Sequence, residues 1–91
     1  MGEIYALYEL YPVDTEVDLN AIIAKVPTII PAGVKYNEPD TKIAPVAFGL
    51  EKVIVGFIID DSDDSVGGNL EEALRNIEGI ENVECAQSTV L

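Results

Sequence analysis

Residues 50–60 read LEKVIVGFIID and carry the strongest strand signal in the chain. Successive side chains of a strand point to opposite faces of the sheet. One face of this segment then carries the apolar residues Val53, Val55, Phe57 and Ile59. The other face is apolar too, at Ile54 and Ile58. A strand that is apolar on both faces is typical of the centre of a sheet, so we expect a central strand here.

Three more strands are predicted around this centre, over residues 3–11, 34–38 and 80–90. The first alternates as a strand with two distinct faces should. Ile4, Ala6, Tyr8 and Leu10 point one way, and Tyr5, Leu7, Glu9 and Tyr11 point the other. Pro39 and Pro45 bracket a stretch that we do not expect in the centre of a sheet, because proline lacks the N–H that a central strand donates.

Two segments have the apolar spacing of helices. Asp18 is a suitable N-cap for the first, and we expect Pro27 to kink or end it. Its apolar residues follow the i, i+3, i+4, i+7 rule at Leu19, Ile22, Ile23 and Val26. The second helix is predicted to begin at the cap Asn69, with Glu72 completing a capping box. Its inner stripe is Leu70, Ala73, Leu74 and Ile77, and Gly79 is a natural end.

The order strand, helix, strand, strand, helix, strand in 91 residues indicates an α+β, ferredoxin-like βαββαβ fold. Both helices would cover one face of a four-stranded antiparallel sheet. We expect a single domain over residues 1–91, with buried side chains at Leu19, Ile22, Leu70 and Leu74.

The other face of this sheet would carry apolar and aromatic side chains without a helix to cover them. They are Tyr5, Leu7 and Tyr11 from the first strand, with Ile54 and Ile58 from the central one. Such an open face is more apolar than solubility requires and suggests a protein partner or a dimer. Cover by the domain's own loops is the alternative.

The chain is strongly acidic, with 17 carboxylates, five basic residues and a net charge of −12. Nucleic-acid affinity depends on Lys and Arg displacing counterions, so direct binding to DNA or RNA is not expected. A basic protein partner would be attracted, although acidity can also serve solubility alone. No uncharged run approaches the roughly 20 residues that span a bilayer, so we expect no membrane association. The single cysteine, Cys85, cannot form an internal disulfide, which fits a cytoplasmic setting.

The sequence gives little support for an enzyme. It has no histidine, the commonest general base near neutral pH. Glu81 and Glu84 lie near Cys85 and disfavour its thiolate. Residues 60–64 lack the ligand spacing of a calcium loop, so a solvated acidic turn is the preferred interpretation. We therefore expect no catalytic residue, no metal and no cofactor.

Residues 45–53, PVAFGLEKV, resemble the signature of the elongation factor 1-beta family. That family comprises small archaeal factors and the homologous C-terminal exchange domain of the eukaryotic proteins. Two further stretches match in order and spacing: residues 17–19, VDL, and residues 77–83, IEGIENV. The resemblance covers essentially the whole chain.

The resemblance implies a ferredoxin-like domain that binds the GTPase elongation factor 1-alpha and accelerates release of GDP. In the family, the loop bearing the signature phenylalanine presses against the GTPase and the phenylalanine enters its nucleotide-binding domain. Phe48 is the matching position, flanked by Ala47 and Gly49. Spacing alone equally permits Phe48 to be a core aromatic at the end of the sheet.

Eukaryotic members carry a lysine next to the C-terminal residue, which reaches toward the magnesium and phosphate site. Here that position is Val90, followed by Leu91. A mechanism in which a cation displaces magnesium is therefore not implied for this chain. We expect Val90 and Leu91 to offer the partner only apolar contact and the terminal carboxylate.

The main alternative is a ferredoxin-like regulatory module of the ACT type, which binds small metabolites at a dimer interface. A purely structural acidic domain is a second alternative. The open face with Tyr5, Leu7 and Tyr11 could serve such a dimer. ACT modules usually have a glycine-rich first turn, whereas residues 12–15 here read PVDT.

Overall fold

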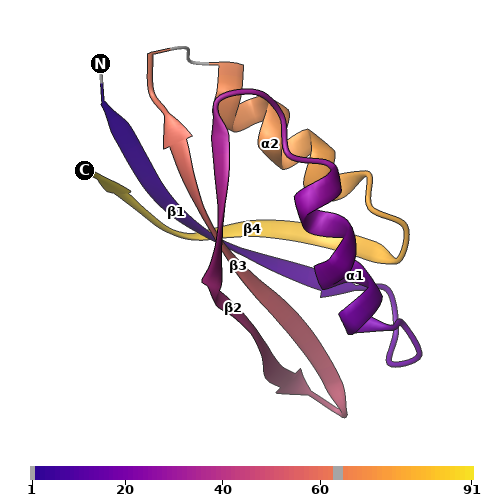
Figure 1. Cartoon of the computed structure of the whole chain (residues 1–91). Helices are drawn as coiled ribbons and strands as arrows, with labels where there is room; N and C mark the ends of the chain where they lie inside the picture. The colour runs from indigo at the N-terminus through magenta and orange to yellow at the C-terminus, as the bar shows by residue number, and fades with distance from the viewer. Residues whose placement is uncertain (1, 63–64) are drawn as a thin grey trace.

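The structure of the chain is a computed structural model that describes residues 2–62 and 65–91. Within these ranges, four strands form one antiparallel sheet in the order β2-β3-β1-β4. Figure 1 shows both helices on the same side of this sheet. The element bounds are β1 Glu3–Pro12, α1 Leu19–Lys25, the 3₁₀ helix η1 Val26–Thr28, β2 Val34–Ala47, β3 Leu50–Asp60, α2 Ser65–Arg75 and β4 Ile80–Val90. The predicted α+β ferredoxin-like fold is confirmed.

β3 is the central strand that its sequence predicts, and it pairs with β1 on one side and with β2 on the other. Its helix-facing side chains are buried, and Phe57 packs edge-on against Tyr8 with ring centroids 6.0 Å apart. Burial raises the pKa of Tyr8 to about 12. The core lies between the sheet and the helices and contains Ala6, Tyr8, Leu10, Ile22, Val26, Val53, Val55, Phe57, Ile59, Val66, Leu70, Leu74, Ile77 and Val83.

α1 begins where its cap predicts. The Asp18 carboxylate accepts hydrogen bonds from the backbone N–H of Asn20 at 3.0 Å and of Ala21 at 3.2 Å. The α-helix ends at Lys25, and the chain continues through Pro27 as η1 because proline cannot donate to the α-helical ladder. Leu19, predicted to be buried, is partly buried and packs against the core.

α2 begins at Ser65, so the predicted start at Asn69 and the capping box with Glu72 are wrong. Val66 explains the longer helix, because it is buried in line with Leu70 and Leu74 and extends their stripe by one turn. The helix ends at Arg75, before the predicted end at Gly79. Gly79 lies in the turn before β4, with a φ of 94°.

β2 is much longer than the predicted residues 34–38. It is an edge strand, and edge strands tolerate proline, so Pro39 and Pro45 do not stop it. Its pairing with β3 is interrupted between Asn37 and Lys42 by a bulge.

The acidic run after β3 begins as a turn. The Asp60 carboxylate accepts a hydrogen bond from the backbone N–H of Ser62 at 3.0 Å. Asp63 and Asp64, which complete the predicted solvated turn, lie outside the described residues. In the part of the chain that the structure describes, no helix is long and apolar enough to cross a membrane.

Candidate partner-binding site

The β2–β3 hairpin extends beyond the four-stranded part of the sheet. β1 pairs with β3 only as far as the Leu10–Val53 pair, whereas β2 and β3 continue to the Ala47–Leu50 pair. Figure 1 shows the end of the resulting ribbon extending beyond both helices. The residues at its end are therefore presented to solvent by two strands alone.

Two residues, Phe48 and Gly49, form the turn at the tip of this hairpin. Both have positive φ angles, 53° and 80°, as a type I′ turn requires. Asparagine, aspartate and glycine are the usual residues in such a turn. Phe48 is the one residue other than glycine with positive φ among those described.

The Phe48 side chain is fully exposed, at 103% of its reference area. It is therefore not the core aromatic that spacing alone permitted. Leaving it in water forgoes the roughly 1.5–3 kcal/mol that burying a phenylalanine contributes. The left-handed backbone costs about 1–2 kcal/mol more. Both costs fall on one residue, which is typical of a site with a functional constraint.

The surroundings of the tip are apolar on the hairpin and acidic beside it. Val46 and Ile43 are exposed on β2 behind Phe48. A hollow of about 210 Å³ separates the hairpin from the segment between β1 and α1. Its lining includes Ile43 and Gly49 together with the acidic residues Asp14, Asp18 and Glu51. The tip is thus an apolar projection next to negative charge.

The open face of the sheet carries the predicted apolar residues, which are half-buried. They surround an ion pair in which Lys52 Nζ donates to Glu9 Oε2 at 2.5 Å. The Tyr11 hydroxyl donates to the other Glu9 oxygen at 3.1 Å, and its ring centroid lies 5.7 Å from the Lys52 ammonium. The hydrogen bond from Lys52 lowers the pKa of Glu9, and the same bond raises the pKa of Lys52. This cluster ties β1 to the base of the projecting hairpin.

Sequence reasoning missed a second polar cluster on the same face. The Tyr5 hydroxyl donates to the Asp40 carboxylate, and Asn37 Nδ2 donates to the same carboxylate oxygen at 2.5 Å. Both lie over Gly56 of β3. A glycine inside a strand is a signal for close approach, but nothing in the sequence says which residue approaches.

Val90 and Leu91 lie at the other end of the sheet from Phe48. Val90 pairs with Ile4 at the start of β1, and the Leu91 N–H donates to the Glu3 carbonyl at 2.8 Å. Both side chains are exposed. The predicted partner-binding residues thus form two separate groups, with Ala47, Phe48 and Gly49 at the tip and Val90 and Leu91 at the tail.

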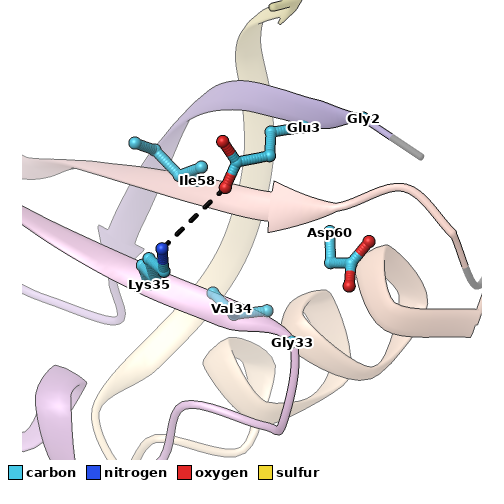
Figure 2. Close-up of a pocket in the computed structure, with 7 residues that line it drawn as sticks. All are labelled: Gly2, Glu3, Gly33, Val34, Lys35, Ile58 and Asp60. Carbon is cyan, nitrogen blue, oxygen red and sulfur yellow. Dashed lines mark ion pairs between the residues drawn. The ribbon is translucent and has the colours of Figure 1, made fainter.

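A hollow of about 630 Å³ lies near the beginning of β1, at the end of the sheet away from the tip. Figure 2 shows Glu3 and Lys35 facing each other across it, with 4.0 Å between Oε2 and Nζ. Their side chains are 51% and 80% exposed, so water screens the pair and it contributes little to stability. This corner is solvated and charged, unlike the apolar tip.

The fold has relatives among solved structures of unrelated sequence. The C-terminal domain of the MgtC protein from Mycobacterium tuberculosis superposes with a TM-score of 0.57 at 10% identity, over 99% of this chain and 88% of that one. The structure titled BlrP1 BLUF superposes with a TM-score of 0.57 at 13% identity, over 100% of this chain and 56% of that one. At these identities the likeness concerns the fold alone.

Sequence comparisons identify the family. The model of the EF-1 guanine nucleotide exchange domain matches residues 5–90. Elongation factor 1-beta of Archaeoglobus fulgidus is 32% identical over the full length of both chains. The Methanosarcina barkeri protein of that name is 35% identical over 92% of each chain, and that of Methanothermobacter thermautotrophicus is 34% identical over 92% of this chain and 91% of its own.

A ferredoxin-like domain with an exposed aromatic at the tip of a projecting hairpin has the features of a protein-binding module. The family defines the module further. The chain belongs to the elongation factor 1-beta family of guanine nucleotide exchange domains, which act in translation. This is a family of exchange factors rather than of enzymes in the usual sense, and membership implies an elongation-factor GTPase as the partner.

Proposed function

We propose that this chain binds elongation factor 1-alpha and accelerates its exchange of GDP for GTP by pressing Phe48 into the GTPase. The observation that carries the proposal is the full exposure of Phe48 on a strained turn at the hairpin tip. A large apolar side chain held in water gains from burial in a partner. The family match favours this role over the ACT-type regulatory module.

Differential binding is sufficient for the mechanism. An exchange factor needs only to bind the nucleotide-free GTPase more tightly than the loaded one, because coupling between the two ligands is reciprocal. If Phe48 fits only when the nucleotide pocket is distorted, its burial free energy weakens the hold on GDP. The two-stranded hairpin delivers the side chain without moving the rest of the domain.

Charge assists the encounter. The chain carries a net charge of −12, and Asp14, Asp18 and Glu51 lie beside the tip. A GTPase that carries tRNA must present basic surface, so an acidic factor would be steered toward it. The same charge opposes direct contact with nucleic acid.

The remaining parts of the proposal follow from the partner. Residues 1–91 act as a single exchange domain that works in the cytoplasm beside the GTPase and uses no cofactor. Ala47 and Gly49 contact the partner next to Phe48. Val90 and Leu91 add apolar contact at the tail, without the cation of the eukaryotic factors.

Stopped-flow release of a fluorescent GDP analogue from elongation factor 1-alpha tests the proposal. Phe48→Ala should slow catalysed release by about 30-fold or more, since an interface hot spot contributes about 2 kcal/mol. Its free energy of unfolding should not fall, because the side chain packs against nothing. Asn69→Ala is the control, because it truncates an exposed side chain on α2, away from the tip. Equal rates for the Phe48 variant and the parent would refute the wedge.

A further inference from the structure

The bulge in β2 lies midway along the hairpin and interrupts its ladder. β2 advances five residues between the pairs Asn37–Gly56 and Lys42–Ile54, while β3 advances two. The extra residues belong to the bulge in β2, over residues 38–41. A bulge bends its strand and increases the local twist. The direction of the ribbon beyond it therefore depends on how these residues are held.

Asp40 is held on the open face from two sides. Tyr5 of β1 donates its hydroxyl to the Asp40 carboxylate, and Asn37 of β2 donates its amide at 2.5 Å. The hydrogen bond to Asp40 raises the pKa of Tyr5, because it favours the protonated phenol that donates it. On the helix side of the same bulge, the hydroxyls of Tyr36 and Thr41 share a hydrogen bond.

The Tyr5–Asp40 bond joins strands that are not neighbours. β3 lies between β1 and β2, so the two backbones are about 10 Å apart. The bond passes over Gly56, the β3 residue that lies directly beneath it. A Cβ on Gly56 would lie 3.0 Å from Asp40 Cβ and 3.2 Å from the Tyr5 hydroxyl oxygen. The missing side chain of Gly56 is what allows this link.

We propose that Tyr5 and Asp40 are positioning residues that fix the direction of the β2–β3 hairpin and so place Phe48 for the partner. The proposal rests on the exchange function proposed above. Beyond the Leu10–Val53 pair the ribbon has no third strand, and a two-stranded ribbon has little stability of its own. Its orientation is set where β2 is tied to the body of the sheet.

The experiment compares four single variants and one double variant with two measurements. Tyr5→Phe removes the donor and Asp40→Ala removes the acceptor, whereas Asp40→Asn keeps an acceptor oxygen. Thr28→Val is the control, because it removes an exposed hydrogen bond of 2.5 Å, to the Lys25 carbonyl, away from the hairpin. Residual dipolar couplings of residues 44–52 report the hairpin direction, and GDP release from elongation factor 1-alpha reports exchange.

We expect Tyr5→Phe and Asp40→Ala to change the tip couplings and to slow exchange by about tenfold, since small misplacements of a positioned group carry large rate costs. Asp40→Asn and Thr28→Val should match the parent in both measurements. The double variant Tyr5→Phe/Asp40→Ala should be no slower than Asp40→Ala alone, because the Tyr5–Asp40 bond is already lost in Asp40→Ala.

The residual dipolar couplings test the positioning role independently of the exchange function. Unchanged couplings in both Tyr5→Phe and Asp40→Ala would overturn the positioning role, even if Phe48→Ala slows exchange as expected. Changed couplings with unchanged exchange would also overturn it. A parent protein that does not accelerate GDP release refutes the exchange function, and the couplings alone then decide whether the bond directs the hairpin.

Discussion

Phe48 combines two local disadvantages that a stability-driven sequence would avoid. Its side chain is exposed and its φ of 53° is one that aromatic residues rarely adopt. Gly49, with a φ of 80°, is by contrast well suited to the second turn position. The turn thus has one residue that suits its geometry and one that does not, which fits the partner-binding role proposed for Phe48.

Phe48→Asn should make the isolated domain more stable. Asparagine tolerates the left-handed conformation and is common in type I′ turns, so the free energy of unfolding should rise by about 1 kcal/mol. Urea denaturation measures this gain, and GDP release from elongation factor 1-alpha should fall in the same variant. Gly49→Ala is the control and should lose stability, because alanine is strained at positive φ. A Phe48→Asn variant no more stable than the parent would contradict the strain argument.

The Glu9–Lys52 pair gives the hairpin base a pH dependence. Lys52 lowers the pKa of Glu9 below its ordinary value of 4.5, so the unfolded chain binds this proton more readily than the folded one. The stabilisation is present above that ordinary value and is lost as pH falls through the lowered pKa. Glu9→Gln should therefore be less stable than the parent at neutral pH, and the difference should shrink in acid.

Urea denaturation over a pH series measures that difference. Glu72→Gln, on the exposed side of α2, is the control for removing one negative charge. A gap between parent and Glu9→Gln that stays constant down to strongly acidic pH would show that Lys52 does not act on the ionised Glu9.

At the scale of elements, the parts with strong local signals were predicted correctly. β3 and β4 have the bounds that alternation predicts, and α1 begins after its Asp18 cap. The errors lie where packing overrides local preference. Gly67 and Gly68 favour a loop, yet buried Val66 holds them in α2. Pro39 and Pro45 disfavour a strand, yet an edge position accommodates them in β2.

The candidate site, like the fold, was predictable only where the signal is local in the sequence. The signature predicted Phe48 in a loop before β3, because the family match lies in a local stretch of sequence. The structure places Phe48 at the tip of the β2–β3 hairpin, and its contact with a partner stays a prediction. The links from Tyr5 to Asp40 and from Glu9 to Lys52 were not predictable, since they join residues 35 and 43 positions apart. Their contact depends on strand order and on the bulge, which periodicity does not specify.

The two glycines of α2 should be replaceable with a gain in stability. A Cβ built on Gly67 or Gly68 meets nothing within 4 Å. Each change to alanine should raise the free energy of unfolding by roughly 0.5–1 kcal/mol, because glycine loses more backbone entropy on helix formation. Urea denaturation checks this, and exchange activity should not change. Gly79→Ala should instead destabilise, since its φ is 94° and its Cβ would lie 3.1 Å from Val17.

At the scale of the whole molecule, the two proposed contact groups are far apart. The domain is 42 Å long, and the hairpin tip and the C-terminal tail lie at opposite ends of its sheet. A partner that touches both must extend along most of the domain. The tip offers a strained, exposed aromatic on a two-stranded ribbon, whereas the tail offers two exposed apolar side chains.

The last prediction follows from this asymmetry: deleting Val90 and Leu91 should leave most exchange activity, whereas Phe48→Ala should lose most of it. The deletion removes exposed apolar surface and the 2.8 Å hydrogen bond from Leu91 to Glu3, so little core packing changes. Parallel stopped-flow measurements on both variants and the parent decide. Exchange abolished by the tail deletion but normal in Phe48→Ala would place the mechanism at the tail, and the wedge would be wrong.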